Sequence, residues 1–150
     1  MSKSEIEIEA LYPLIEEVIA SGGEFRLYPK GTSMLPLIRQ GIDSVVLVSA
    51  QDVAENDIVF YKRDNGQFVL HRLVKTKGEE YVMCGDIQNE LEYGIRKEQI
   101  LAKVAYCYKE DKRVSFDTKE YKKYVKSLPR MRRKRKIKAF LSSVKHKIFK

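Results

Sequence analysis

The chain has 150 residues, of which 43% are apolar and 33% are charged. This length fits one domain with its own core, and this composition excludes a disordered chain. The net charge is +8, but the excess of positive charge lies in residues 119–150. This segment has 14 Lys or Arg residues and one acidic residue, Glu120, for a local charge of +13. Residues 1–118 carry a net charge of −5. We therefore interpret the molecule as an acidic body with a basic tail, which argues against nucleic-acid binding by the whole protein.

Simple counts exclude several further classes of protein. No apolar run approaches the roughly 20 residues of a membrane-spanning helix. The acidic, polar stretch Met1–Ala10 is not typical of a secretory signal. Two cysteines and two histidines supply neither a disulfide framework nor the ligands of a structural zinc site. We expect no metal and no cofactor, with Cys84 and Cys107 reduced and buried.

The first predicted element is a helix over residues 4–20. Its apolar residues recur at spacings of three and four, Ser4 can cap its first turn, and Ser21-Gly22-Gly23 ends it. One helix followed by a strand is not a helix-turn-helix, so the pattern contains no repressor-like DNA-binding head. We treat residues 1–23 as an N-terminal helical unit.

Residues 24–118 form the predicted β domain. Short apolar runs alternate with turn residues, and Asn65-Gly66 between two such runs is a strong hairpin signal. This spacing predicts a mainly β fold with a compact, largely antiparallel, barrel-like sheet. The expected strands are Phe25–Tyr28, Ser44–Val48, Ile58–Lys62, Phe68–Lys75, Tyr81–Cys84, Ile100–Tyr108 and a short Arg113–Phe116.

Residues 119–150 form a separate basic tail. We predict a helix over Lys119–Ser127, a break at Pro129 and then a basic amphipathic helix. The cluster Arg130–Lys136 has six basic residues in seven, and each contributes about 1 kcal/mol near an anionic bilayer. An anionic membrane surface is therefore the favoured partner of residues 130–150. A solvated helix packed on the body, or binding to nucleic acid or another partner, are the alternatives.

Three segments of the β domain carry candidate catalytic residues. In Gly31–Pro36, Ser33 follows a glycine turn and precedes a Met-x-Pro that cannot start a regular strand, which keeps its hydroxyl accessible. His71 is the one histidine of the body and shares a strand face with Val69 and Leu73. A serine needs a base to become a nucleophile, and a neutral imidazole suits that role at pH 7. Asp86 lies in a Gly-Asp turn after a predicted strand, and close to the histidine it would orient the imidazole.

These segments resemble, in their order along the chain, the catalytic domain of the signal peptidase I and LexA-type serine peptidases. Gly31–Pro36 is similar to the G-x-S-M-x-P serine box of that family, and Leu70–Val74 is similar to its base box. The remaining boxes resemble Asp57–Tyr61, Gly85–Asn89 and Ile100–Val104, so the likeness covers about residues 25–108. A histidine at the base position is typical of the endoplasmic-reticulum, archaeal and sporulation types of signal peptidase.

The resemblance implies a serine endopeptidase that cleaves a peptide or a leader. It implies Ser33 as the nucleophile, His71 as the general base and Asp86 as the partner of the histidine. Glu92 stands where this group often has a second aspartate. We expect an oxyanion hole formed by the Ser33 N–H, with Thr32 as a second donor. Met34 and Pro36 are expected to bind the substrate. Lys62 and Lys75 are the alternative candidates for the general base.

The chain departs from that family at its N-terminal helix. Signal peptidases carry a transmembrane anchor before the serine box, whereas this sequence has an amphipathic helix there. We therefore expect an enzyme located in the cytoplasm or peripherally on the cytoplasmic membrane face, held there by its basic tail. The alternative from another class is a non-catalytic module that binds a peptide by strand addition. A LexA-like self-cleaving regulator is disfavoured by the histidine base and by the lack of an Ala-Gly or Cys-Gly site upstream of Ser33.

Overall fold

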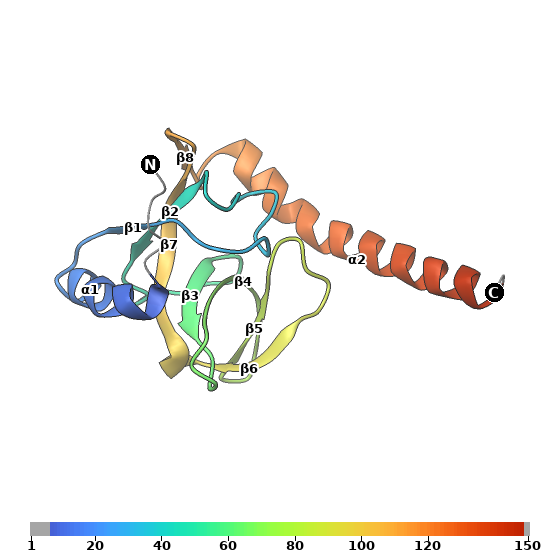
Figure 1. The fold of residues 1–150 in the computed structure, drawn as a ribbon, viewed down its shortest axis with the longest axis horizontal. Helices are drawn as coiled ribbons and strands as arrows, with labels where there is room; N and C mark the ends of the chain where they lie inside the picture. The colour runs from blue at the N-terminus through green and yellow to red at the C-terminus, as the bar shows by residue number, and fades with distance from the viewer. Residues whose placement is uncertain (1–6, 149–150) are drawn as a thin grey trace.

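Eight antiparallel strands form one open sheet at the centre of the fold, in a computed structural model that describes residues 7–148 (Figure 1). The strand order is β1-β2-β7-β3-β4-β5-β6, and β8 pairs with the end of β7. The strands are β1 (Phe25–Leu27), β2 (Ser44–Val48), β3 (Ile58–Lys62), β4 (Phe68–Lys77), β5 (Glu80–Cys84), β6 (Glu92–Arg96), β7 (Ile100–Lys109) and β8 (Lys112–Ser115).

The mainly antiparallel β class is confirmed, whereas the barrel-like closure is not found. In the described part of the chain no pairing joins β1 to β6, so both remain edge strands. A strand of three residues such as β1 offers few backbone groups for closing a sheet. Two strands, β2 and β3, have the predicted limits, and the other expected strands differ by one or two residues at their ends.

Strand β6 was not predicted from the sequence. Its five residues contain Gly94, which has a φ of +80°, and Ile95 is its one fully buried side chain. The segment therefore lacks the apolar alternation by which a strand is recognised. It is held instead by its pairing with β5, in which Tyr81 lies opposite Ile95.

The N-terminal helix α1 (Ile8–Ala20) packs against the sheet rather than standing apart from it. Ile15 has 1% of its surface exposed and belongs to the larger apolar cluster, together with Leu27, Leu47 and Phe60. The predicted cap, Ser4, lies outside the described residues. A second, smaller cluster lies on β3, β4, β5 and β6 and contains Val59, Tyr61, Val69, Leu73, Met83 and Ile95.

The C-terminal helix α2 (Lys119–Ile148) runs without interruption through Pro129, so the predicted break there is wrong. A proline inside a helix removes one backbone hydrogen bond and crowds the preceding turn. Here Pro129 is exposed, while its neighbour Leu128 is 2% exposed, and Tyr124 and Arg135 hydrogen-bond to the body on either side of it. These tertiary contacts hold the helix on both sides of the proline.

The second half of α2 extends beyond the body (Figure 1). Ile137, Phe140 and Leu141 are 58%, 66% and 59% exposed. From Lys136 to Lys145, no described side chain makes a hydrogen bond or ion pair with the body. Neither this helix nor any other in residues 7–148 has both the length and the apolar character needed to cross a bilayer.

Candidate functional site

Ser33 and His71 line the same pocket, which has a volume of about 430 Å³. Ser33 lies in the loop between β1 and β2, and His71 lies on β4, so the pocket lies between this loop and the sheet. The Oγ atom of Ser33 makes no hydrogen bond with any residue of the described chain, including His71. In free enzymes a nucleophile and its base are often further apart than in the substrate complex. The two groups therefore share a cavity without being hydrogen-bonded in this state.

The loop that carries Ser33 is anchored at its far end by the buried carboxylate of Asp43. Asp43 accepts hydrogen bonds from the backbone N–H and the guanidinium of Arg39, from Lys109 Nζ and from the N–H of Glu110. Burial alone would raise the pKa of Asp43, but these donors outweigh it and hold the pKa well below its usual range. Lys109 also donates to the carbonyls of Pro36 and Leu37. The segment just after the serine is thus fixed by charge-assisted hydrogen bonds.

The side chain of His71 is buried, with 5% of the residue exposed, and its Nδ1 lies 3.3 Å from the hydroxyl oxygen of Tyr61. Tyr61 donates its own proton to Oε1 of Glu92, at 2.5 Å. A carboxylate can only accept, so the tyrosine oxygen is left to accept from Nδ1–H. This chain of hydrogen bonds places the imidazole proton on Nδ1. The lone pair of Nε2 then remains available, as a general base requires.

Burial, together with the positive charge of Arg63, also keeps the imidazole of His71 neutral. Burial is the main cause that lowers the pKa of His71, to about 4, and the positive charge of Arg63 lowers it further. Glu92 and Asp86 act in the opposite direction. The imidazole of His71 is therefore uncharged throughout the neutral pH range and can accept a proton there.

Glu92 and Arg63 complete this arrangement behind the histidine. Arg63 donates to both carboxylate oxygens of Glu92, at 2.8 and 3.2 Å. Burial would raise the pKa of Glu92, but the hydrogen bonds from Arg63 and Tyr61 outweigh it and lower the pKa. Glu92 therefore remains ionised and reaches His71 indirectly, through the tyrosine.

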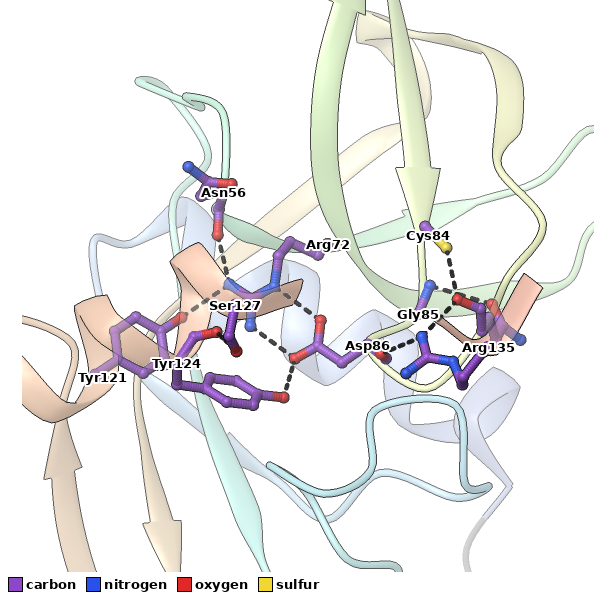
Figure 2. Close-up of polar contacts among 10 residues, drawn as sticks. Asn56, Arg72, Cys84, Gly85, Asp86, Tyr121, Tyr124, Ser127 and Arg135 are labelled. Atoms are coloured by element: carbon purple, nitrogen blue, oxygen red, sulfur yellow. Dashed lines mark hydrogen bonds and ion pairs between the residues drawn. The ribbon is translucent and has the colours of Figure 1, made fainter. Parts of the chain in front are cut away.

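Asp86 does not contact His71, contrary to the sequence-based prediction. Its carboxylate forms a two-point ion pair with the buried guanidinium of Arg72, at 2.8 Å for each hydrogen bond (Figure 2). Tyr124 of α2 donates to the same carboxylate at 2.7 Å. Strand alternation explains why Asp86 is kept from His71. Arg72 is the residue next to His71 on β4, so its side chain projects from the opposite face of the sheet and takes Asp86 with it. Asp86 compensates the buried arginine, which would otherwise be an unpaired charge.

The loop that carries Asp86 supports the serine instead of the histidine. The N–H of Ile87 donates to the Ser33 carbonyl at 3.1 Å. A Cβ atom built on Gly85 would lie 2.6 Å from the same carbonyl oxygen, so only glycine fits at this position. The Gly-Asp turn therefore positions the backbone of Ser33 by direct contact.

The remaining predicted site residues divide between the pocket and its surroundings. Thr32 and Met34 line the pocket, although Met34 is also a core residue with 4% exposure. Pro36 is exposed and does not line it. The rival bases lie outside it, with Lys62 over the ring of Phe68 and Lys75 over the ring of Tyr93. Of the three bases proposed from the sequence, His71 alone lines the pocket together with Ser33.

Cys84 and Cys107 are both unpaired and buried. Burial raises the pKa of Cys107 to about 11, which makes its thiol a poor nucleophile at neutral pH. Within residues 7–148 no group of three or more His, Cys, Asp or Glu side chains is arranged to hold a metal ion.

Five residues of the site were not identified from the sequence: Tyr61, Arg63, Arg72, Tyr124 and Arg135. Strand alternation from His71 could have drawn attention to Arg72, since a charged residue inside an apolar strand needs a partner. Tyr61 lies two residues along β3 from Val59, the strand partner of His71, and its role depends on that pairing. Tyr124 and Arg135 come from α2, and no local pattern links that helix to the Gly-Asp turn.

The arrangement combines an accessible serine hydroxyl, a neutral buried imidazole with a defined proton position, and an adjoining pocket. Such groups can carry out acyl transfer from a peptide or ester to water. No protein-family model matches this chain, and no curated protein does.

Proposed function

We propose that the protein is a serine endopeptidase of the signal-peptidase type, with the corresponding catalytic-domain fold. The observation that carries the proposal is that Ser33 and His71, which are far apart in the sequence, line one pocket. The proton of His71 lies on Nδ1 according to the hydrogen-bond chain to Tyr61 and Glu92, which suits Nε2 to act as a base. The order of motifs along the chain supports the same assignment.

In this mechanism, the Ser33 Oγ attacks the carbonyl carbon of the scissile peptide bond, and His71 Nε2 takes the serine proton. The carbon–nitrogen bond then breaks, and His71 returns the proton to the leaving amine. A water molecule, deprotonated by His71, attacks the resulting ester and releases the acid and the free serine. The backbone N–H of Ser33 is the proposed donor to the oxyanion, with the Thr32 hydroxyl as a second donor.

A peptide substrate fits the free backbone edge of β4. Residues 68–71 pair with β3 on one side, whereas pairing with β5 begins at Arg72. Phe68, Val69 and Leu70 line the pocket together with the serine and the histidine. Among residues 7–148 no strand pairs with this segment on the β5 side, so its backbone groups there can hydrogen-bond to an extended peptide, which would then pass beside Ser33.

The test is covalent labelling of the purified full-length protein with a fluorophosphonate probe, followed by cleavage of a peptide mixture read by mass spectrometry. We expect labelling at Ser33 and cleavage that requires His71. Ser33→Ala abolishes labelling, and His71→Ala lowers its rate by about 10²- to 10⁴-fold, as for loss of a general base.

Matched controls are Ser142→Ala and His146→Ala, which change the same residue types in the distal helix. Both controls are expected to label and cleave like the wild type. Unchanged cleavage in Ser33→Ala would contradict the peptidase assignment. A peptide that binds tightly and survives uncleaved would favour the alternative, a non-catalytic binding module.

The distal half of α2 supports a second element of the proposal, attachment to an anionic membrane surface. Ile137, Phe140, Leu141 and Val144 follow one another at helical spacings of three and four. They lie on the side of the helix opposite to Tyr124, Leu128 and Arg135, which contact the body. Lys and Arg side chains flank this apolar stripe, so its chemistry matches a layer of acidic lipid headgroups over hydrocarbon. The enzyme would then work peripherally at a membrane face, on peptides presented there.

A further inference from the structure

The Gly85–Asn89 loop lies between the nucleophile and α2, and both sides bind it. On one side it contacts Ser33 through the Ile87 N–H, at 3.1 Å, and through the close approach of Gly85. On the other side it is bound by Tyr124 and Arg135 of the helix (Figure 2). The serine and the helix therefore share one loop as their common support.

Arg135 makes the more extensive of the two contacts from the helix. Its Nε donates to the Asn89 side chain at 2.8 Å, and its Nη2 donates to the carbonyls of Asp86 and Gln88 at 3.2 and 3.1 Å. Figure 2 shows this guanidinium facing the turn that follows Cys84. Three hydrogen bonds from one planar group restrict the orientation of the loop more than a single contact would.

Tyr124 acts at the other end of the same loop. Its hydroxyl donates to Asp86 Oδ2 at 2.7 Å, on a carboxylate that Arg72 also holds. Tyr121, one helical turn earlier, accepts from Arg72 Nη1 at 2.9 Å. The side chain of Asp86 is thus fixed from the sheet and from the helix together.

We propose that α2 is a positioning element for the catalytic serine, acting through Tyr124 and Arg135 on the Gly85–Asn89 loop. This inference rests on the proposed function of Ser33. No described residue of α2 lines the pocket, so the effect of the helix passes through the loop and the Ser33 carbonyl. Small displacements of a nucleophile reduce the rate strongly, by about 100-fold for about 1 Å.

The same helix carries the exposed apolar stripe in its distal half, beyond Arg135. Both the stripe and the residues that hold the loop belong to one continuous helix. The proposed membrane contact and the contacts to the Gly85–Asn89 loop therefore lie on a single element.

The test uses Tyr124→Phe, which removes one hydroxyl, and Arg135→Gln, which removes the guanidinium. Lys126→Gln is the matched control, because Lys126 is an exposed cation of the same helix that hydrogen-bonds to no described residue. For each full-length protein, kcat and KM on a soluble peptide, the melting temperature and the amide exchange of Ile87 are measured. Peptide turnover is replaced by the fluorophosphonate labelling rate where no cleaved peptide is found.

We expect kcat to fall by about 10- to 100-fold in Arg135→Gln, and by a smaller factor in Tyr124→Phe. KM and the pH midpoint set by His71 should stay at the wild-type values, since the substrate edge and the base are not altered. Exchange of the Ile87 amide should become faster in both variants and stay unchanged in Lys126→Gln. A general loss of stability would instead lower the melting temperature and speed exchange throughout the sheet.

Wild-type kcat and wild-type Ile87 exchange in Arg135→Gln would overturn the positioning role of α2. Failure of the proposed function has a different signature, namely a wild-type protein without any Ser33-dependent labelling or cleavage. In that case Ile87 exchange still decides whether the helix holds the loop, because this readout does not depend on catalysis.

Discussion

The hydroxyl oxygen of Tyr61 lies 3.3 Å from Nδ1 of His71, and the same hydroxyl donates a hydrogen bond to Glu92. This contact determines which ring nitrogen carries the proton, and so which nitrogen can act as a base. The carboxylate that supports the histidine is therefore Glu92, which acts through a tyrosine. A buried tyrosine in this position avoids placing a negative charge directly against the imidazole.

Tyr61→Phe tests this relay because it removes the acceptor for Nδ1–H while keeping the ring. One hydrogen bond contributes about 1 kcal/mol, so we expect the labelling rate to fall by about five- to tenfold. Tyr93→Phe, an exposed tyrosine on β6, is the control and should leave the rate unchanged. An equal rate in Tyr61→Phe and wild type would show that the tautomer of His71 does not depend on this contact.

The pH dependence of activity follows from the lowered pKa of His71. A general base works in its neutral form, so kcat/KM should rise with pH up to about 4 and then remain level through neutral pH. An ordinary histidine would instead give a midpoint near its usual value of about 6.5. The measurement is the fluorophosphonate labelling rate between about pH 3.5 and 8, the window that spans both values.

Arg63→Gln should move this midpoint upward. The positive charge of Arg63 lowers the pKa of His71, and its loss also leaves the Glu92 carboxylate without its ion-pair partner. Arg96→Gln, which breaks an exposed ion pair with Asp64, is the matched control. A midpoint that stays at the wild-type pH in Arg63→Gln would contradict the electrostatic account of His71.

The stability of the folded protein should also depend on His71 in mildly acidic solution. The folded pKa, about 4, lies below the unfolded value of 6.5, so the unfolded state binds the proton more readily. The free energy of unfolding should therefore decrease as the pH falls from about 6.5 towards 4. Urea unfolding at several pH values measures this slope.

His71→Gln should flatten the slope between about pH 6.5 and 5, because the paired carboxylates titrate at lower pH. Asp43 and Glu92, whose pKa values are lowered, contribute stability that is lost only as the pH falls through the acidic range. A slope that is the same in His71→Gln and wild type would mean that His71 is not the group responsible.

Membrane attachment is tested by co-sedimentation of the full-length protein with vesicles. We expect binding to vesicles that contain phosphatidylglycerol, weaker binding to pure phosphatidylcholine, and a loss of binding at high salt. Phe140→Ser should weaken binding by about tenfold or more, because a buried phenylalanine contributes about 1.5–3 kcal/mol. Ser142→Ala is the control.

Two outcomes would contradict the lipid partner. If Phe140→Ser binds anionic vesicles like the wild type, the apolar stripe does not enter the bilayer. If the protein instead binds DNA or RNA oligonucleotides more tightly than vesicles at the same salt concentration, the partner of the basic cluster is a nucleic acid.

The sequence by itself determined the β class, the position of every strand except β6 to within one or two residues, the unequal distribution of charge and the candidate pair Ser33 and His71. These features are local, because apolar alternation, turn residues and short motifs act over a few neighbouring residues. The same local rules failed at β6, where Gly94 interrupts the alternation, and at Pro129, where tertiary contacts hold the helix on either side.

Only the tertiary structure decided which charged groups meet. Asp86 pairs with Arg72 because adjacent residues on β4 project to opposite faces, and the partner of each is set by strands and helices distant in sequence. Glu92 reaches His71 through Tyr61 because β3 pairs with β4 and the two side chains come within hydrogen-bonding distance. Burial then changes the pKa of each group, and burial is a property of the assembled fold rather than of any short segment.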